Sequence, residues 1–107
     1  MKSIRYSDSL RQWNEGYDLA QRFTVRLPEI LTPSADSVDG EWGRDKDQAG
    51  RDLVTLRLHD SRDEVVGKFG LDTLREQPET MFQLNRLWLK FLNAQLDRLI
   101  EKMKSED

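Results

Sequence analysis

The side chains most able to do chemistry in this sequence are few, and the single histidine is the first to consider. His59 is followed directly by Asp60 and Ser61, which are the residue types of a nucleophilic relay. Successive residues of a strand point to opposite faces, so neighbours in sequence are poorly placed to pass a proton. One histidine without cysteine is also an uncommon zinc ligand set. We therefore interpret His59 as a strand-end residue and predict no catalytic residue.

An acidic stretch offers the nearest approach to a metal site. Asp45, Asp47 and Gly50 match positions 1, 3 and 6 of a calcium-binding EF-hand loop. Positions 5 and 12 are then Ala49 and Leu56, which removes two ligands, including the bidentate carboxylate. The pattern therefore predicts no metal site.

Glycines flank a lysine in the segment Gly67, Lys68, Phe69, Gly70. Their spacing matches neither the P-loop nor the dinucleotide-binding pattern, so we predict no cofactor. Taken together, these segments favour a non-enzymatic protein. A small enzyme or ligand-binding protein without a recognisable motif stays open as a third interpretation.

Composition limits the choice of partner and compartment. The 107 residues carry a formal charge of −3, with 36% hydrophobic and 35% charged residues and no cysteine. An acidic chain is a poor candidate for nucleic-acid binding driven by overall charge, so we do not expect nucleic acid as its partner. The lack of cysteine suits a cytoplasmic protein. The N-terminus lacks the apolar core of a signal peptide, and charges interrupt the longest apolar run, so no transmembrane segment is predicted.

The long apolar pattern near the C-terminus predicts an amphipathic helix over about 78–103, with Pro78 in its first turn. Its large apolar side chains spread over about 220° of the helix circumference, whereas a helix lying on one core needs a stripe only a little over about 100° wide. At about 1.5 Å per residue it would be about 39 Å long, similar to the diameter of a compact chain of this size. The apolar surface that one core does not bury must therefore be buried against a second protein surface.

We expect a second copy of the chain to provide this surface, because closed two-fold dimers are the commonest oligomers. We therefore predict a protein-interaction or assembly module, a homodimer through this helix or a complex with another protein. The main alternative is that the N-terminal segment of the same chain buries the second face of the helix. We do not expect the helix to lie on a membrane surface, because acidic residues lie in the middle of its polar arc. The predicted partner-binding residues are Leu87, Trp88, Phe91, Leu92, Leu99 and Met103, with Trp42 as either a core residue or an exposed anchor.

The rest of the chain indicates a single α+β domain. Residues 7–22 favour an N-terminal helix, followed by a short extended piece at 23–27. The Gly-rich and Asp-rich segment 32–52 shows no periodicity and is predicted to be a polar acidic loop. Alternating apolar residues at 53–59 and 65–71 predict a hairpin within a small antiparallel sheet that packs against the long helix.

Two further interpretations affect the N-terminal third. Alternation over residues 17–27 could instead indicate a strand that ends at Pro28. Four residues also have the spacing of a helix-turn-helix: Ala20, Thr24, Val25 and Ile30. With the following hairpin as a wing, the order of elements resembles winged-helix regulators, and this resemblance implies DNA binding. However, Thr24 replaces the usual turn glycine, and Arg22 and Arg26 are the only cations near the expected recognition helix.

Overall fold

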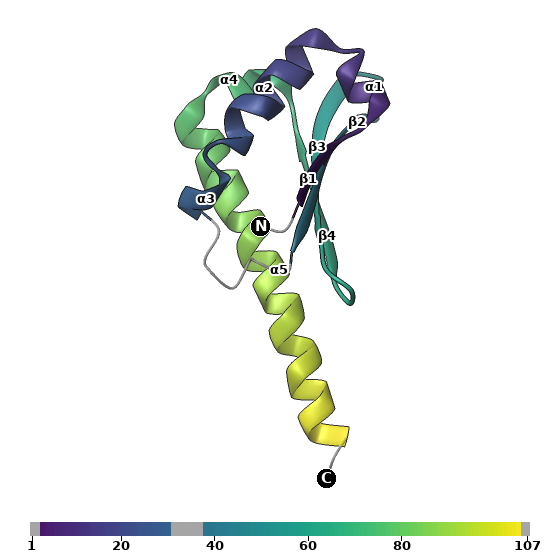
Figure 1. The fold of residues 1–107 in the computed structure, drawn as a ribbon, viewed down its shortest axis with the longest axis vertical. Helices are drawn as coiled ribbons and strands as arrows, with labels where there is room; N and C mark the ends of the chain where they lie inside the picture. Colours follow the sequence, from purple (N-terminus) through teal and green to yellow (C-terminus); the bar gives the residue numbers. More distant parts are fainter. Residues whose placement is uncertain (1–2, 31–37, 106–107) are drawn as a thin grey trace.

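A four-stranded sheet and a long C-terminal helix organise the computed structural model, which describes residues 3–30 and 38–105 (Figure 1). The elements in chain order are β1 (Ser3–Tyr6), α1 (Asp8–Arg11), α2 (Asn14–Thr24), α3 (Leu27–Ile30), β2 (Asp39–Lys46), β3 (Asp52–His59), β4 (Glu64–Phe69), α4 (Leu71–Arg75) and α5 (Gln77–Ser105). The α+β class, the hairpin and the long C-terminal helix predicted from the sequence are confirmed.

The strands lie in the order β1-β2-β3-β4. The β3–β4 pair is antiparallel, as the predicted hairpin requires. The β2–β3 pair, which was not predicted, is also antiparallel, but β1 pairs with β2 in parallel at one edge, so the sheet is not purely antiparallel as predicted. Burial alternates along β3, where Val54, Leu56 and Leu58 are buried and Thr55 and Arg57 are only partly covered. One face of the sheet therefore packs against the helices, and the other carries the polar side chains.

The core lies between that apolar face and the helices. Its buried apolar residues are Leu10, Leu19, Ala20, Phe23, Leu27, Val38, Trp42, Val54, Leu56, Leu58, Phe69, Leu74, Leu84, Leu87, Trp88 and Phe91. Among the described helices, α2 and α5 each contribute several of these buried residues. Those of α5 are Leu84, Leu87, Trp88 and Phe91. The first half of α5 is thus an integral part of the domain.

The N-terminal segment is mainly helical, as predicted, but its elements differ from the predicted ones. A strand, β1, precedes the helical region, and the helix divides at Trp13 into α1 and α2. The divide has a packing reason, because the Trp13 ring lies on Gly16, where an added Cβ would come within 2.5 Å of the ring. The extended piece predicted at 23–27 is wrong, as α2 continues to Thr24 and α3 begins at Leu27.

The predicted acidic loop at 32–52 is also wrong over much of its length. Residues 39–46 form β2, which pairs with β3 along its whole length, and a short turn follows it. Residues 32–37 lie outside the described residues. Glycine and aspartate have low strand propensity, so the sequence alone gave no strand signal here. Pairing with β3 and burial of Trp42 stabilise the strand instead.

A hydroxyl at the end of α2 joins three elements. Thr24 Oγ1 accepts hydrogen bonds from Trp42 Nε1 and from the Tyr6 hydroxyl, each 2.8 Å long, and donates to the Ala20 carbonyl at 2.9 Å. Trp42 is fully buried, so its indole N–H has no access to water. The network therefore fixes β1 and β2 against α2.

Replacing Thr24 by valine should lower the free energy of unfolding by about 1–3 kcal/mol, because the isosteric side chain leaves a buried indole N–H without an acceptor. Urea denaturation followed by Trp fluorescence measures this loss. Thr24→Ser is the matched control and should retain most of the stability, since it keeps the hydroxyl. If the valine variant is as stable as the serine variant, the hydroxyl does not hold these elements together.

Candidate protein-interaction surface

Helix α5 carries two apolar faces with different surroundings. The inner face, Leu84, Leu87, Trp88 and Phe91, is buried in the core between the sheet and the helices. A second set points elsewhere and comprises Leu89, Leu92, Leu96, Leu99, Ile100 and Met103, which we call the outer stripe. At about 100° per residue the centres of the two faces are about 120° apart around the helix.

The outer stripe is largely exposed to solvent within one chain. Leu96 is 53% exposed, Leu99 54% and Met103 63%, and Leu92 alone is partly packed against the core. The stripe extends over about 21 Å of helix from Leu89 to Met103, at about 1.5 Å per residue. Single exposed apolar residues are ordinary, but a contiguous row of this kind indicates a contact surface.

Four of the seven predicted partner-binding residues lie in the chain's own core. Leu87, Trp88, Phe91 and Trp42 are each at most 4% exposed, so in this structure they support the domain from within. For Trp42 this is the first of the two outcomes expected from the sequence. The other three, Leu92, Leu99 and Met103, lie on the outer stripe.

Sequence reasoning missed Leu89, Leu96 and Ile100 as contact candidates, although a signal was present. Leu89, Leu96 and Met103 recur every seven residues, and Leu92 and Leu99 each follow three residues after one of them. This spacing is the a and d pattern with which two helices pack along a shared seam.

The two ends of α5 are held differently. At its start, the Thr80 hydroxyl is fully buried and donates to the Thr73 carbonyl at 2.6 Å, which fixes the turn between α4 and α5. Further along, the hairpin turn after β3 contacts the helix: Gln95 Nε2 donates to Asp60 Oδ2 at 3.0 Å, and Arg98 pairs with Asp63. Beyond these contacts the helix extends past the sheet and the other helices (Figure 1).

This projection gives the molecule an elongated shape. The principal extents are 52 × 30 × 25 Å, and the radius of gyration is 14.9 Å. A compact domain of similar length is expected near 13 Å. The final turns of α5 therefore present the end of the outer stripe, Ile100 and Met103, away from the rest of the domain, where a second molecule can approach from the side.

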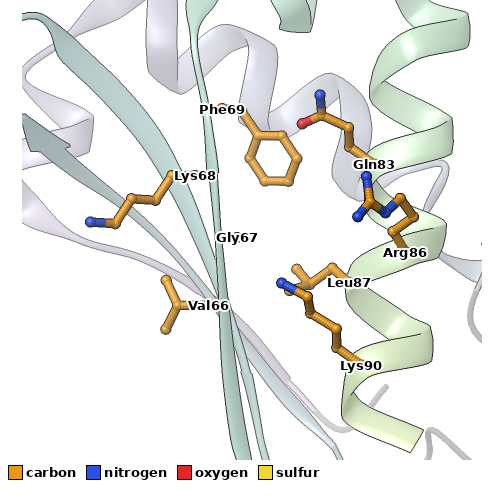
Figure 2. Close-up of a pocket in the computed structure, with 8 residues that line it drawn as sticks. All are labelled: Val66, Gly67, Lys68, Phe69, Gln83, Arg86, Leu87 and Lys90. Carbon is orange, nitrogen blue, oxygen red and sulfur yellow. The ribbon is translucent and has the colours of Figure 1, made fainter. Parts of the chain in front are cut away.

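A separate groove lies where β4 meets α5. It is lined by Val66, Gly67, Lys68 and Phe69 of β4 and by Gln83, Arg86, Leu87 and Lys90 of α5, and has a volume of about 310 Å³. Figure 2 shows the side chains of Phe69 and Leu87 pointing into the space between strand and helix, with Arg86 and Lys90 projecting from the helix. The described lining residues include three cations and no acid.

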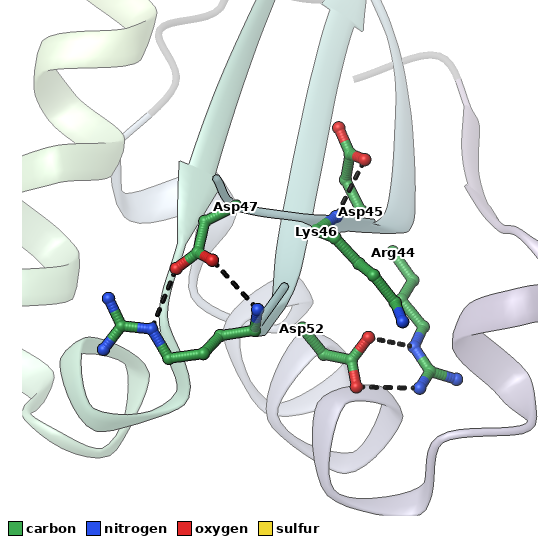
Figure 3. Close-up of polar contacts among 6 residues, drawn as sticks. Arg44, Asp45, Lys46, Asp47 and Asp52 are labelled. Carbon is green, nitrogen blue, oxygen red and sulfur yellow. Dashed lines mark hydrogen bonds and ion pairs between the residues drawn. The ribbon is translucent and has the colours of Figure 1, made fainter. Parts of the chain in front are cut away.

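The acidic residues considered for calcium instead hold the turn between β2 and β3 (Figure 3). Asp47 Oδ1 accepts from the backbone N–H groups of Ala49 and Arg51, both at 2.9 Å, and Oδ2 accepts from Arg51 Nε at 3.0 Å. Gly50 has φ +80°, the left-handed conformation that glycine adopts without strain. Within residues 3–30 and 38–105, no group of three potential ligands is placed to hold a metal ion.

Hydrogen bonds and nearby cations lower the pKa of three carboxyl groups at this turn. The Arg51 backbone N–H lowers the pKa of Asp47, and a side-chain hydrogen bond from Arg44 lowers the pKa of Asp52. The pKa of Asp45 is lowered chiefly by the Lys46 backbone N–H and then by Lys68. Figure 3 shows the two parallel bonds from Arg44 to Asp52, which are 3.1 and 2.9 Å long.

Acid should therefore weaken this turn. Asp47 ionises below its ordinary value of 3.8 in the folded chain, so its contribution is complete above that pH and is lost as the pH falls through the lowered value. We expect wild type to be more stable than Asp47→Asn at about pH 7, with the difference shrinking toward about pH 2. Urea denaturation of both proteins across this range tests the expectation, and a difference that does not change with pH would contradict it.

His59 and the residues of the helix-turn-helix pattern lie in different parts of the fold. His59 lies at the end of β3, opposite Asp39 of β2 and Glu64 of β4 in the ladder. Val25, which the helix-turn-helix pattern places in a core, is 79% exposed, whereas Ala20 is buried. In the described part of the chain, no helix is both long enough and apolar enough to cross a bilayer.

Comparison with known proteins adds no relative to this description. No protein family, no curated protein and no solved structure matches the chain. A functional proposal for this protein therefore rests on the surface features described above.

Proposed function

We propose that this protein is a non-enzymatic assembly module that forms a two-fold homodimer through the outer stripe of α5. The observation that supports the proposal most directly is the row of half-exposed apolar side chains at heptad spacing on a helix that projects from its own domain. Water contact with this row is unfavourable, and burial contributes about 25 cal/mol for each Å² of apolar surface removed from water.

A second copy is the occupant that fits the stripe best. The a and d spacing is matched by another helix with the same spacing, and each copy supplies it. In a two-fold contact the same patch serves both molecules, so no additional partner surface is required. The final turns also carry acids and bases together, Asp97 and Glu101 beside Lys102 and Lys104, so paired helices need not repel one another.

Disulfide cross-linking tests this contact directly, because the chain has no cysteine of its own. We expect single cysteines at Leu92, Leu96 or Leu99 to give covalent dimers on mild oxidation, since a two-fold axis brings some stripe position close to its own copy. Cross-linking at all three positions would indicate a parallel pair, and cross-linking only at the position nearest the axis an antiparallel one.

Glu101→Cys is the matched control for this experiment. Glu101 is exposed on the same helix but lies outside the outer stripe, so it should give little covalent dimer. Equal cross-linking at Glu101 and at the stripe positions would indicate random collision, and no cross-linking at any stripe position would exclude the proposed contact.

A further inference from the structure

The edge of the sheet beside α5 is a second feature of the surface, separate from the outer stripe. β4 is the last strand in the order β1-β2-β3-β4, and within residues 3–30 and 38–105 no other strand pairs with its outer edge. Asp60 N donates to Asp63 O at 3.0 Å, so these residues form a hydrogen-bonded pair at the start of the β3–β4 ladder.

The ladder pattern shows which backbone groups of β4 point outward. In an antiparallel pair, hydrogen-bonded and non-bonded positions alternate. Counting from the Asp60–Asp63 pair, the positions bonded to β3 are Val65, Gly67 and Phe69. The N–H and C=O groups of Val66 and Lys68 therefore point away from β3, as the unpaired groups of an edge strand do.

The groove along this edge is positively charged, although the chain as a whole has a charge of −3. Arg86 and Lys90 project over the groove from α5, and neither has a carboxylate at ion-pair distance among the described residues. Arg86 lies over the ring of Phe82, with its guanidinium carbon 5.9 Å from the ring centre. Lys68 points to the opposite face of β4, where it pairs with Asp45 at 3.4 Å.

The spacing of these cations matches that of an added strand. Arg86 and Lys90 are four residues apart on the helix, or about 6 Å along its axis. Alternate residues of a strand, which share one face, are about 6.6 Å apart. Figure 2 shows α5 and β4 side by side, with Gln83 near the level of Phe69 and Lys90 near that of Val66. Two acidic residues at alternate positions of such a strand would each face one of these cations.

We propose that an extended acidic segment of another protein binds this groove by adding a strand to the edge of β4. Its backbone would pair with the outward groups of Val66 and Lys68, and its alternate acidic side chains would face Arg86 and Lys90. Gly67 instead lets α5 lie close to β4, because an added Cβ would come within 3.0 Å of Leu87 Cδ2 and 3.1 Å of the Phe69 ring. When an extended peptide binds to an edge strand, backbone hydrogen bonds provide the affinity and alternate side chains provide the specificity.

A fluorescently labelled short peptide of alternating valine and glutamate is the probe, and fluorescence anisotropy is the readout. We expect the full-length protein to bind it, and the double variant Arg86→Glu/Lys90→Glu to bind at least about tenfold more weakly. Lys104→Glu is the control, because it makes one of the same charge changes on an exposed part of the same helix beyond the groove. The same peptide with lysine in place of glutamate should not bind.

Val66→Pro separates strand addition from simple anion binding. Proline removes the outward N–H of Val66 without removing a bond to β3, so the fold should persist while peptide binding is lost. Circular dichroism checks the fold. Unchanged peptide affinity in Val66→Pro would overturn strand addition, and equal weakening by Lys104→Glu would overturn the groove as the site. Leu96→Asp should leave peptide binding intact, so failure of the dimer proposal is distinguishable from failure of this one.

Discussion

Phe91→Ala is expected to lower the free energy of unfolding by about 3–5 kcal/mol, the usual cost of truncating a buried phenylalanine. Phe91 is fully buried and stacks on Trp88, with their ring centres 5.6 Å apart. Its loss would leave a cavity between α5 and the sheet that the surrounding side chains fill only in part. Urea denaturation at one fixed, low protein concentration measures the change, since the proposed dimerisation would make apparent stability depend on concentration.

Phe82→Ala is the matched control for that experiment. Phe82 is the same residue type on the same helix, but it is 57% exposed in the single chain, so its truncation should cost less than about 1 kcal/mol at protein concentrations low enough to keep the chain monomeric. Similar losses for the two variants would contradict the placement of Phe91 in the core and of Phe82 at the surface.

Leu96→Asp/Leu99→Asp should convert the proposed dimer into a folded monomer. Both residues are about half exposed in the single chain, so charges there cost the fold little. Across the proposed contact the same charges would be buried without partners and placed near their copies, which costs several kcal/mol per dimer. Sedimentation velocity reports the loss of the dimer, and circular dichroism reports the retained helix.

The control for the aspartate pair is Asn93→Asp/Lys104→Gln. It changes the charge of the same helix by the same amount, −2, at exposed residues outside the outer stripe. This variant should remain dimeric. Loss of the dimer in both double variants would point to overall charge and not to the stripe, and loss of fold in the aspartate pair would mean that the stripe belongs to the core.

The elements with strong periodicity were the ones that sequence could predict. The helix predicted at 78–103 is α5, Gln77–Ser105, and the two predicted strands are β3 and β4. By contrast, β2 depends on tertiary pairing, because its glycines and aspartates have low intrinsic strand propensity. The end of α2 was missed for a similar reason, since Thr24 is held by Trp42 and Tyr6, which are distant in sequence.

The sequence indicated how wide the apolar surface of α5 is, but not which part of it faces the core. The width of the apolar arc on α5 indicated more apolar surface than one core needs, and the structure has a buried inner face and an outer stripe that is about half exposed. Periodicity cannot say which face turns inward, because both recur at helical spacing. Only packing against the sheet separates Trp88 and Phe91 from Leu96 and Leu99. The groove at β4 was not predictable either, since the strand edge and Arg86 come together only in the fold.

The solution mass of the wild-type protein, measured by light scattering over a wide concentration range, shows whether two copies of the chain associate. The outer stripe predicts a mass twice that of the 12.6 kDa chain, falling toward the single-chain value on dilution. A mass of one chain at every concentration, with the helix intact by circular dichroism, would contradict the proposed assembly.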